Sequence, residues 1–368
     1  MKALVQKISL PAGRRVLVVS DIHGMLPWLQ SLLDRANFSQ NDILILLGDL
    51  LEKGPESLAT LRYVMALSQT HTVYTVSGNC DGLAAHLEPQ PGFDEDDIMA
   101  YLRVHPESIV RQMAKELTLR LKTREDLIRL REALPATFGP ELAFLRGLPT
   151  ILESPDYVFV HGGVPSFEHM EQLDAWACMK NDAFWLQGYS FPKYCVVGHW
   201  PVTLYREEIP CFDPLIDRER KIISIDGGCG VKIDGQLNLL ILPERPDGDF
   251  SWLRQDGLPL RRALDRQDEG PSKPFTTHWT DNTVDIISPG DELTLCRHRS
   301  TGRELLILND FLSVREGRAF CQDSTDYRLP VNPGDLLSLV AETGSGALMK
   351  KDGVTGWYYG RLEAHPPH

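Results

Sequence analysis

Five short polar clusters in this sequence each follow an apolar run, and their side chains are of the kinds that bind metal ions. Carboxylate and amide oxygens together with imidazole nitrogens suit two divalent transition-metal ions, such as Mn, Fe or Zn, better than Ca²⁺, which prefers ligand sets made only of oxygen. Two such cations lying close together need a bridging carboxylate, and a hydroxide held between them would be aimed at phosphorus. The clusters are Asp21 with His23, Gly48-Asp49, Gly78-Asn79, His161 and His199.

The first cluster lies in the segment Arg15 to Gly24, RVLVVSDIHG, around which the rest of the chain is organised. Its apolar run, VLVV, is typical of a strand that is buried on both faces. Because side chains alternate in an extended chain, we expect Asp21 and His23 to point the same way. By itself the tetrapeptide DIHG also fits an Asp-initiated turn beside a surface histidine. The other four clusters favour the metal-binding interpretation.

The elements that would position these clusters alternate between strand and helix. A parallel α/β sheet with polar residues at the carboxyl ends of its strands carries its site at that edge. The predicted helices cover residues 25–36 and 56–67. The predicted strands cover residues 16–19, 42–47, 73–76, 157–160, 194–197, 222–225 and 237–242.

Two segments break this alternation. Residues 82–148 have apolar residues at roughly helical intervals, which predicts an inserted cap of two to four helices, interrupted near Pro106 and Pro135. The cap could shape substrate access or merely cover the edge of the sheet. Residues 243–275, rich in Pro, Gly, Arg and Asp, are interpreted as a linker with a short helix or hairpin. Short strands and Gly-containing turns then predict a small all-β domain, a barrel, over residues 276–368.

Composition limits the classes of partner. The 368 residues carry a net charge of −13 and no Lys- or Arg-rich block, which argues against electrostatic capture of nucleic acid or of an anionic membrane. A phosphate substrate stays possible, because bound cations would dominate the local field. Seven scattered cysteines indicate reduced thiols. The first fifteen residues lack the apolar core of a signal peptide and no stretch is long enough to span a bilayer, so we expect a cytoplasmic protein.

The blocks DIHG, GDLLEKGP, GNCD, VHGG and VVGHW resemble the five signature blocks of the calcineurin-like metallophosphoesterases, over about residues 15–242. The spacing around HGG and GHW resembles the branch that includes bacterial diadenosine tetraphosphatases and serine/threonine phosphoprotein phosphatases. This resemblance implies a four-layer α/β/β/α sandwich over residues 1–242 with metals at the strand ends. It also implies Asp21 and His23 as ligands of the first metal, Asp49 as the bridge, and Asn79, His161 and His199 as ligands of the second.

The sequence departs from that branch at two places. Cys80 follows Asn79 where the branch has the histidine that protonates the leaving group, and a thiol with a pKa near ~8.5 matches that role less well. Similar GNCD blocks are found in small prokaryotic phosphodiesterases, which moves the expected substrate away from phosphoproteins. Cys80 could equally be a small buried residue beside the metals.

The second departure is Glu52-Lys53, where the branch has Asp-Arg. Lys53 can supply positive charge to a phosphate, although without the bidentate fork of arginine, and Glu52 could orient a neighbour. Arg206 either contacts the substrate phosphate or is a surface residue. Asp226 either lies near the site or forms a simple turn. The candidate catalytic residues are Cys80, Asp81, Lys53 and Glu52, and the candidate substrate contacts are Lys53 and Arg206.

The cluster Trp357-Tyr358-Tyr359 resembles bacterial SH3-like barrels. It could bind a peptide, protein or cell-wall ligand, or it could form the core of the barrel. The expected activity is metal-dependent hydrolysis of a small-molecule phosphate mono- or diester or a nucleotide. Two alternatives stay open: a metal-binding regulatory or scaffold protein with weak or no turnover, and a serine/threonine protein phosphatase.

Overall fold

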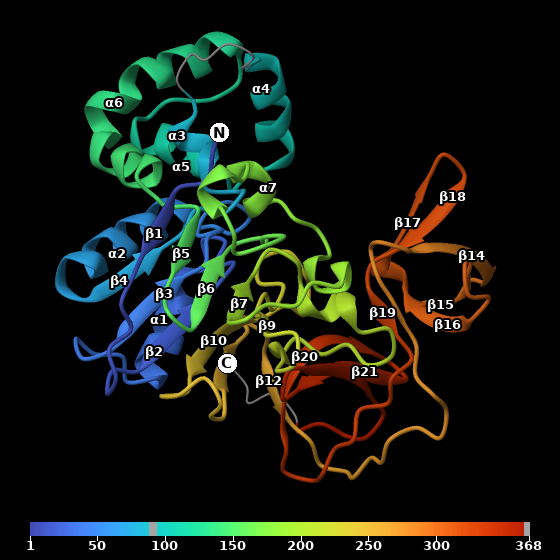
Figure 1. Cartoon of the computed structure of the whole chain (residues 1–368). Coiled ribbons are helices and arrows are strands. Elements are labelled where there is room, and N and C mark those ends of the chain that lie inside the picture. The colour runs from blue at the N-terminus through green and yellow to red at the C-terminus, as the bar shows by residue number, and fades with distance from the viewer. Residues whose placement is uncertain (88–93, 364–368) are drawn as a thin grey trace. The chain divides into compact units, whose positions relative to one another are not determined.

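The structure is a computed structural model that describes residues 1–87 and 94–363 (Figure 1). The chain divides into two compact units. The first contains Met1–Pro201 and Pro214–Asp256, and the second contains Val202–Asp213 and Gly257–His368. The predicted boundary at residue 242 is therefore too early. Residues 88–93 of the predicted cap and residues 364–368 of the predicted C-terminal domain lie outside the described residues.

A five-stranded sheet in the first unit carries three of the polar clusters. The apolar strands β2 and β3 are buried along their whole length. Strands β2, β3 and β4 run parallel, so their carboxyl ends share one edge. In spatial order the strands are β11 (Ser251–Gln255), β10 (Leu237–Leu242), β2 (Val16–Val19), β3 (Ile43–Leu46) and β4 (Thr72–Thr75).

A six-stranded sheet in the same unit carries the other two clusters. Here β6, β7 and β9 run parallel, and they place the residues that follow them at one edge. In spatial order the strands are β1 (Val5–Lys7), β5 (Ile151–Glu153), β6 (Tyr157–Val160), β7 (Tyr194–Val197), β9 (Ile222–Ser224) and β8 (Leu215–Asp217).

Alternate side chains of β2 reach two different cores, which shows how the layers are stacked. Leu17 and Val19 pack with the helical layer formed by α1 (Leu26–Arg35), α2 (Ser57–Thr70) and the cap. Val16 and Val18 pack between the two sheets, against residues of β6 and β7. The opposite face of the six-stranded sheet is covered by a segment that includes α7 (Ala175–Met179). The helix, sheet, sheet, helix order agrees with the expected four-layer sandwich.

The inserted segment is helical, as predicted, and Figure 1 shows its long helices grouped at one end of the first unit. Asp94 caps α4 by accepting the backbone N–H of Asp96, and Pro106 lies between α4 and α5. Pro135 and Pro140 both lie within α6, and the helix is kinked at Phe138, where φ is −117° and ψ is 22°. Two missing N–H donors so close together explain the kink. The helices are α3 (Gly82–Ala85), α4 (Glu95–Val104), α5 (Ile109–Glu116) and α6 (Arg124–Arg146).

The predicted linker over residues 243–275 is wrong in part, because strands occupy portions of it. β11 pairs with β10 in antiparallel register, with Leu253 opposite Leu239 and Trp252 opposite Leu240. The next strand, β12 (Leu260–Arg262), pairs with β20 of the second unit. Cross-strand packing with partners far along the chain makes strands of a segment whose composition is typical of a loop.

The second unit is all-β, as predicted, but its described strands form three open sheets, and the predicted SH3-like barrel is not observed. Two separate hydrophobic cores serve the four-stranded and the five-stranded sheets. The four-stranded sheet has the order β12, β20 (Leu336–Thr343), β21 (Gly346–Lys351), β22 (Val354–Tyr358). The two-stranded sheet pairs β13 (Thr276–Thr277) with β19 (Ser324–Thr325). The five-stranded sheet has the order β16 (Glu304–Leu308), β15 (Leu293–His298), β14 (Thr283–Ser288), β18 (Arg318–Cys321), β17 (Leu312–Arg315).

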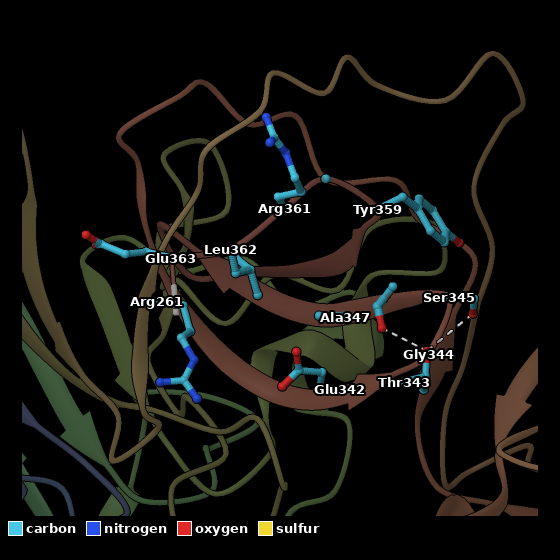
Figure 2. A pocket seen from close by; sticks show the side chains of 12 residues that line it. Arg261, Glu342, Thr343, Gly344, Ser345, Ala347, Tyr359, Arg361, Leu362 and Glu363 are labelled. Atoms are coloured by element: carbon cyan, nitrogen blue, oxygen red, sulfur yellow. Dashed lines mark hydrogen bonds between the residues drawn. The ribbon is translucent and has the colours of Figure 1, made fainter. Parts of the chain in front are cut away.

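Two of the three aromatic residues singled out in the second unit are core residues. Trp357 and Tyr358 are buried, and each donates a hydrogen bond to a main-chain carbonyl. Tyr359 is 53% exposed and lines a polar cavity of about 450 Å³, with Ser345 on the same side and Arg261 across from it (Figure 2). Ligand binding by this unit therefore stays a prediction, and of these three aromatic residues only Tyr359 is exposed enough to contact a ligand.

No helix within residues 1–87 and 94–363 is both long and apolar enough to cross a membrane. All seven cysteines lie in the described part of the chain, and none of them forms a disulfide.

Candidate metal centre

The residues that follow parallel strands supply the candidate ligands. Asp21 and His23 follow β2, and Asp49 follows β3 at the same sheet edge. His161 and His199 follow the neighbouring strands β6 and β7 of the other sheet. The side chains of all five residues are buried, with exposed fractions between 0% and 6%.

The backbone at this edge is not extended, so the expected strand-like alternation at Asp21 and His23 is wrong. Asp21, His23, Asp49 and His199 have φ of 54°, 50°, 49° and 67°, in the left-handed region that residues with a Cβ seldom adopt. Each such residue stores local strain, which the surrounding structure must offset. The loops nevertheless bring the side chains together: Nε2 of His23 lies 4.0 Å from Oδ1 of Asp21.

Asp49 lies between two groups of donor atoms. Its Oδ2 is 3.7 Å from Nε2 of His23, and its Oδ1 is 3.3 Å from Nε2 of His161. Two groups of residues could each hold an ion, because within each group the ligand atoms all lie within 4.8 Å of one another. The first group is His23, Asp49 and Cys80, and the second is Asp21, Asp49 and His161. Because Asp49 belongs to both groups, it is the carboxylate that could bridge two cations.

The remaining predicted ligands lie beside these groups. Oδ1 of Asn79 is 3.3 Å from Nε2 of His161. The rings of His161 and His199 are 5.3 Å apart between centroids, and the backbone N–H of His199 donates to Oδ2 of Asp21 at 3.0 Å. All six predicted metal ligands therefore lie around one buried cluster.

In each of the three histidines, one ring nitrogen contacts an oxygen acceptor that is not among the proposed ligands. Nδ1 of His23 lies 3.0 Å from the carbonyl oxygen of Leu51, and Nδ1 of His161 lies 2.7 Å from that of Leu47. Since a carbonyl only accepts, both Nδ1 atoms carry protons, and each Nε2 faces the carboxylate of Asp49. Nε2 of His199 lies 2.7 Å from Oδ1 of Asp182, which leaves Nδ1 free. This arrangement is typical of histidines that bind metal ions.

The cluster contains several buried carboxylates, which are stabilised only if positive charge lies close to them. Burial lowers the pKa of His161, but Asp49 and Asp21 outweigh it and raise this pKa to about 10. Burial would raise the pKa of Asp49, yet the charge of His161 and the hydrogen bond from it hold that pKa well below its usual range. Burial and the charge of Asp21 raise the pKa of Asp226. A protonated imidazole thus offsets buried carboxylates here, and the residues present fit divalent cations in that role.

Asp81 lies behind the ligands and is not in contact with solvent. Its carboxylate accepts the backbone N–H groups of Gly78, Asp49, Leu50 and Leu51, at 2.8, 2.9, 2.9 and 3.2 Å. With both oxygens engaged by the backbone, Asp81 fixes the shape of the loop that carries Asp49. It serves the site through that loop, and a direct catalytic role stays a prediction.

Glu52 is directed into the cap. Its Oε2 accepts the hydroxyl of Tyr101 at 2.9 Å, and its Oε1 accepts the hydroxyl of Ser108 and the backbone N–H of Ile109 at 3.0 and 3.1 Å. Burial raises the pKa of this carboxyl above its usual value, in spite of these donors. The backbone at Glu52 lies in the left-handed region, with φ of 68°. Glu52 therefore links a site loop to the cap.

Lys53 and Cys80 lie on the candidate centre's loops. The backbone N–H of Cys80 donates to Oδ1 of Asp49 at 2.8 Å, and burial together with Asp49 raises the pKa of its thiol well above the ordinary value. The thiol therefore stays protonated at neutral pH. Lys53 is near enough to influence His105 of the cap, whose pKa is lowered by partial burial and then by the Lys53 charge.

Two further candidates have different outcomes. Asp226 is buried and accepts the backbone N–H of Gly228 at 2.7 Å within a turn. Burial raises its pKa, and it also lies close enough to the cluster for the charge of Asp21 to raise that pKa further. Arg206 belongs to the second unit, where its carbonyl oxygen lies 2.7 Å from Nε2 of His278. Contact of Arg206 with a substrate stays a prediction.

Sequence reasoning missed Asp182, Lys180 and the cap residues Tyr101 and His105. Asp182 and Lys180 lie in a loop with no motif, at a spacing from His199 that carries no periodic signal. The ring centroids of Tyr101 and His105 lie 4.1 Å apart with the rings tilted by 35°, which a helical spacing of four residues permits. Nothing in the sequence indicates that Tyr101 contacts Glu52.

Buried carboxylates and histidines therefore gather at the strand ends of a layered α/β sandwich, as in a candidate metal centre. The family model of the calcineurin-like phosphoesterases matches residues 14–221, more than half of the chain. This chain belongs to the calcineurin-like phosphoesterase family.

Curated relatives match a shorter segment. The symmetrical bis(5'-nucleosyl)-tetraphosphatase of Vibrio parahaemolyticus is 51% identical over 65 residues, which is 17% of this chain and 24% of the relative. The enzyme of the same name from Colwellia psychrerythraea is 36% identical over 88 residues, 24% of this chain and 31% of the relative. The chain thus matches about a quarter to a third of the length of these relatives.

Among solved structures, a protein serine/threonine phosphatase from Saccharomyces cerevisiae aligns with a TM-score of 0.43 and 11% identity, over 70% of this chain and 85% of that one.

Proposed function

We propose that this chain is a metal-dependent phosphoester hydrolase whose centre holds two divalent or trivalent cations, Mn, Fe or Zn, with Asp49 as the shared ligand. The observation that carries the proposal is the position of Asp49, whose two oxygens face His23 and His161 at 3.7 and 3.3 Å. Asp21 and His23 would complete the first position. The ligands proposed for the second are Asn79, His161 and His199.

When bound, two such cations would act as Lewis acids on a phosphoryl group and lower the pKa of a coordinated water. The chain's own residues supply the rest. Leu47 and Leu51 carbonyls and the Asp182 carboxylate set the tautomers of the histidines, and Lys53 offers a positive charge for a phosphate oxygen. The Cys80 thiol, which is protonated, could donate to the leaving group.

The proposed substrate is a small molecule, a phosphate ester or a nucleoside polyphosphate. The names of the matching relatives, symmetrical bis(5'-nucleosyl)-tetraphosphatases, support a nucleotide. The GNCD block around Cys80, which is similar to blocks in small prokaryotic phosphodiesterases, weakens the case for phosphoproteins.

A substrate panel tests the proposal. The full chain, loaded with Mn²⁺, Fe or Zn²⁺, is assayed for p-nitrophenol release from p-nitrophenyl phosphate and bis(p-nitrophenyl) phosphate. Nucleotide products are measured from a dinucleoside tetraphosphate, and phosphate release is measured from a phosphopeptide. Turnover of a small ester or of the nucleotide is expected. Asp49→Asn should bind neither cation tightly and fall below about 1% of the wild-type rate. Bound metal without turnover on any substrate would instead support a scaffold protein, and a preference for the phosphopeptide would support a protein phosphatase.

A further inference from the structure

His199 differs from the other two ligand histidines in what holds its ring. His23 and His161 each donate from Nδ1 to a main-chain carbonyl of the loop that follows β3. These acceptors are part of the folded backbone and cannot leave without unfolding. His199 instead donates from Nε2 to Oδ1 of Asp182, a side chain that is 51% exposed. The orientation of one proposed ligand thus depends on a single surface carboxylate.

Lys180 competes for the same ring nitrogen. Its Nζ lies 3.4 Å from Nε2 of His199, and it also pairs with Asp182. An ammonium only donates, so it can bond Nε2 only when that nitrogen has a lone pair and the ring proton is on Nδ1. A carboxylate only accepts, so Asp182 requires the proton on Nε2. The two side chains therefore favour opposite tautomers of one imidazole, and the shorter distance belongs to Asp182.

We propose that Asp182 is the positioning residue of the second cation: by accepting the Nε2 proton of His199 it keeps the lone pair of Nδ1 available to the metal. When Asp182 is removed, Lys180 favours the other tautomer, in which the proton is on Nδ1. The inference rests on the proposed two-cation centre and deepens it. Occupancy of the second position depends on an exposed side-chain contact, whereas the first position depends on buried backbone contacts.

Four variants of the full chain test this with Zn²⁺ binding by equilibrium dialysis. Asp182→Ala should bind the first equivalent as the wild type does and the second about 10- to 100-fold more weakly. Lys180→Met should bind both equivalents at least as tightly as the wild type. The double variant should recover most of the loss, because no ammonium remains to stabilise the wrong tautomer. Glu168→Ala, which removes an exposed carboxylate from the same unit, should change nothing.

A second measurement separates tautomer control from a merely structural effect. Nitrogen-15 NMR of the histidines in the metal-free chain should show the Nε2–H tautomer of His199 in the wild type and a shift toward Nδ1–H in Asp182→Ala. Asp182→Asn keeps an acceptor oxygen and should restore the wild-type tautomer in part. Unfolding temperatures in EDTA should agree among all variants, because Asp182 is exposed.

The inference is overturned if Asp182→Ala binds two equivalents with affinities within about twofold of the wild type, well short of the loss expected for an outer-shell partner. It is also overturned if the wild-type His199 carries its proton on Nδ1. A wild-type chain that binds one equivalent only would contradict the proposed two-cation function, and the His199 tautomer would then still decide the role of Asp182.

Discussion

Oε2 of Glu52 accepts the hydroxyl of Tyr101 at 2.9 Å, which ties the loop after β3 to the inserted cap. Ser108, the N-cap residue of α5, donates to the other carboxylate oxygen, and so does the backbone N–H of Ile109. The same loop carries Asp49, so the cap is attached to the segment that holds the proposed bridging ligand. The insertion is therefore part of the framework of the site and does more than cover a sheet edge.

Glu52→Ala should destabilise the first unit. The substitution leaves the hydroxyls of Tyr101 and Ser108 and one backbone N–H without their acceptor in a buried place, at a cost of about 3 kcal/mol. Urea unfolding of the full chain measures the loss. Glu52→Gln is the matched control, since its amide oxygen still accepts from Ser108 and Ile109, and it should retain most of the stability. Equal stability of the alanine variant and the wild type would contradict the anchoring role.

The same carboxyl predicts a pH dependence of stability. Burial raises the folded-state pKa of Glu52 above its ordinary value of 4.5, so the native state keeps a proton that the unfolded chain has already released. Stability from this group is complete below pH 4.5 and is lost as the pH rises through the folded pKa. In EDTA, wild-type stability minus that of Glu52→Gln should therefore decrease with rising pH. A difference that stays flat or increases would show the opposite sign.

Asp81→Asn should weaken both folding and metal binding. An asparagine presents an NH₂ group where one carboxylate oxygen accepts backbone N–H groups, so at least two donors of the loop around Asp49 lose their acceptor. The expected cost is about 2 to 4 kcal/mol in free energy of unfolding. Asp97→Asn, on an exposed face of α4, is the control and should be neutral. Unaltered unfolding of Asp81→Asn would mean that the loop does not need this carboxylate.

Cys80→Ala distinguishes a proton donor from a buried spacer. Alkyl phosphate esters need protonation of a poor leaving group, whereas p-nitrophenolate leaves without it. If the protonated Cys80 thiol donates, the variant should lose about 10²-fold or more in kcat on an alkyl ester and little on the p-nitrophenyl ester. Equal effects on both substrates would leave Cys80 as a packing residue beside Asp49.

The buried strands and the polar residues after them could be predicted from the chain, because both are local features. The pairing of two sheets in a sandwich was implied by the family resemblance and not by the strand pattern, and the ligand set stays a prediction. The orientation of Asp21 and His23 could not be predicted, since the prediction assumed extended backbone where both residues are left-handed. The partners of Glu52 could not be predicted for another reason: they lie about fifty residues further along, in the cap.

In other parts of the chain, strand pairing produced structure that the amino-acid composition did not predict. Residues 251–255 look like part of a linker but form β11, because Leu253 and Trp252 pack opposite apolar residues of β10. Turn signals after residue 276 correctly predicted short strands. They carried no information on which strands pair, and three open sheets formed in place of one barrel.

The backbone N–H of His199 donates to the carboxylate of Asp21, 178 positions earlier, across the seam where the two sheets meet. Cations bound there would act as a cross-link between the two halves of the first unit, much as a disulfide closes a long loop. Chelation should then loosen the whole sandwich cooperatively, and the resting stability of the protein in a cell would follow its supply of metal.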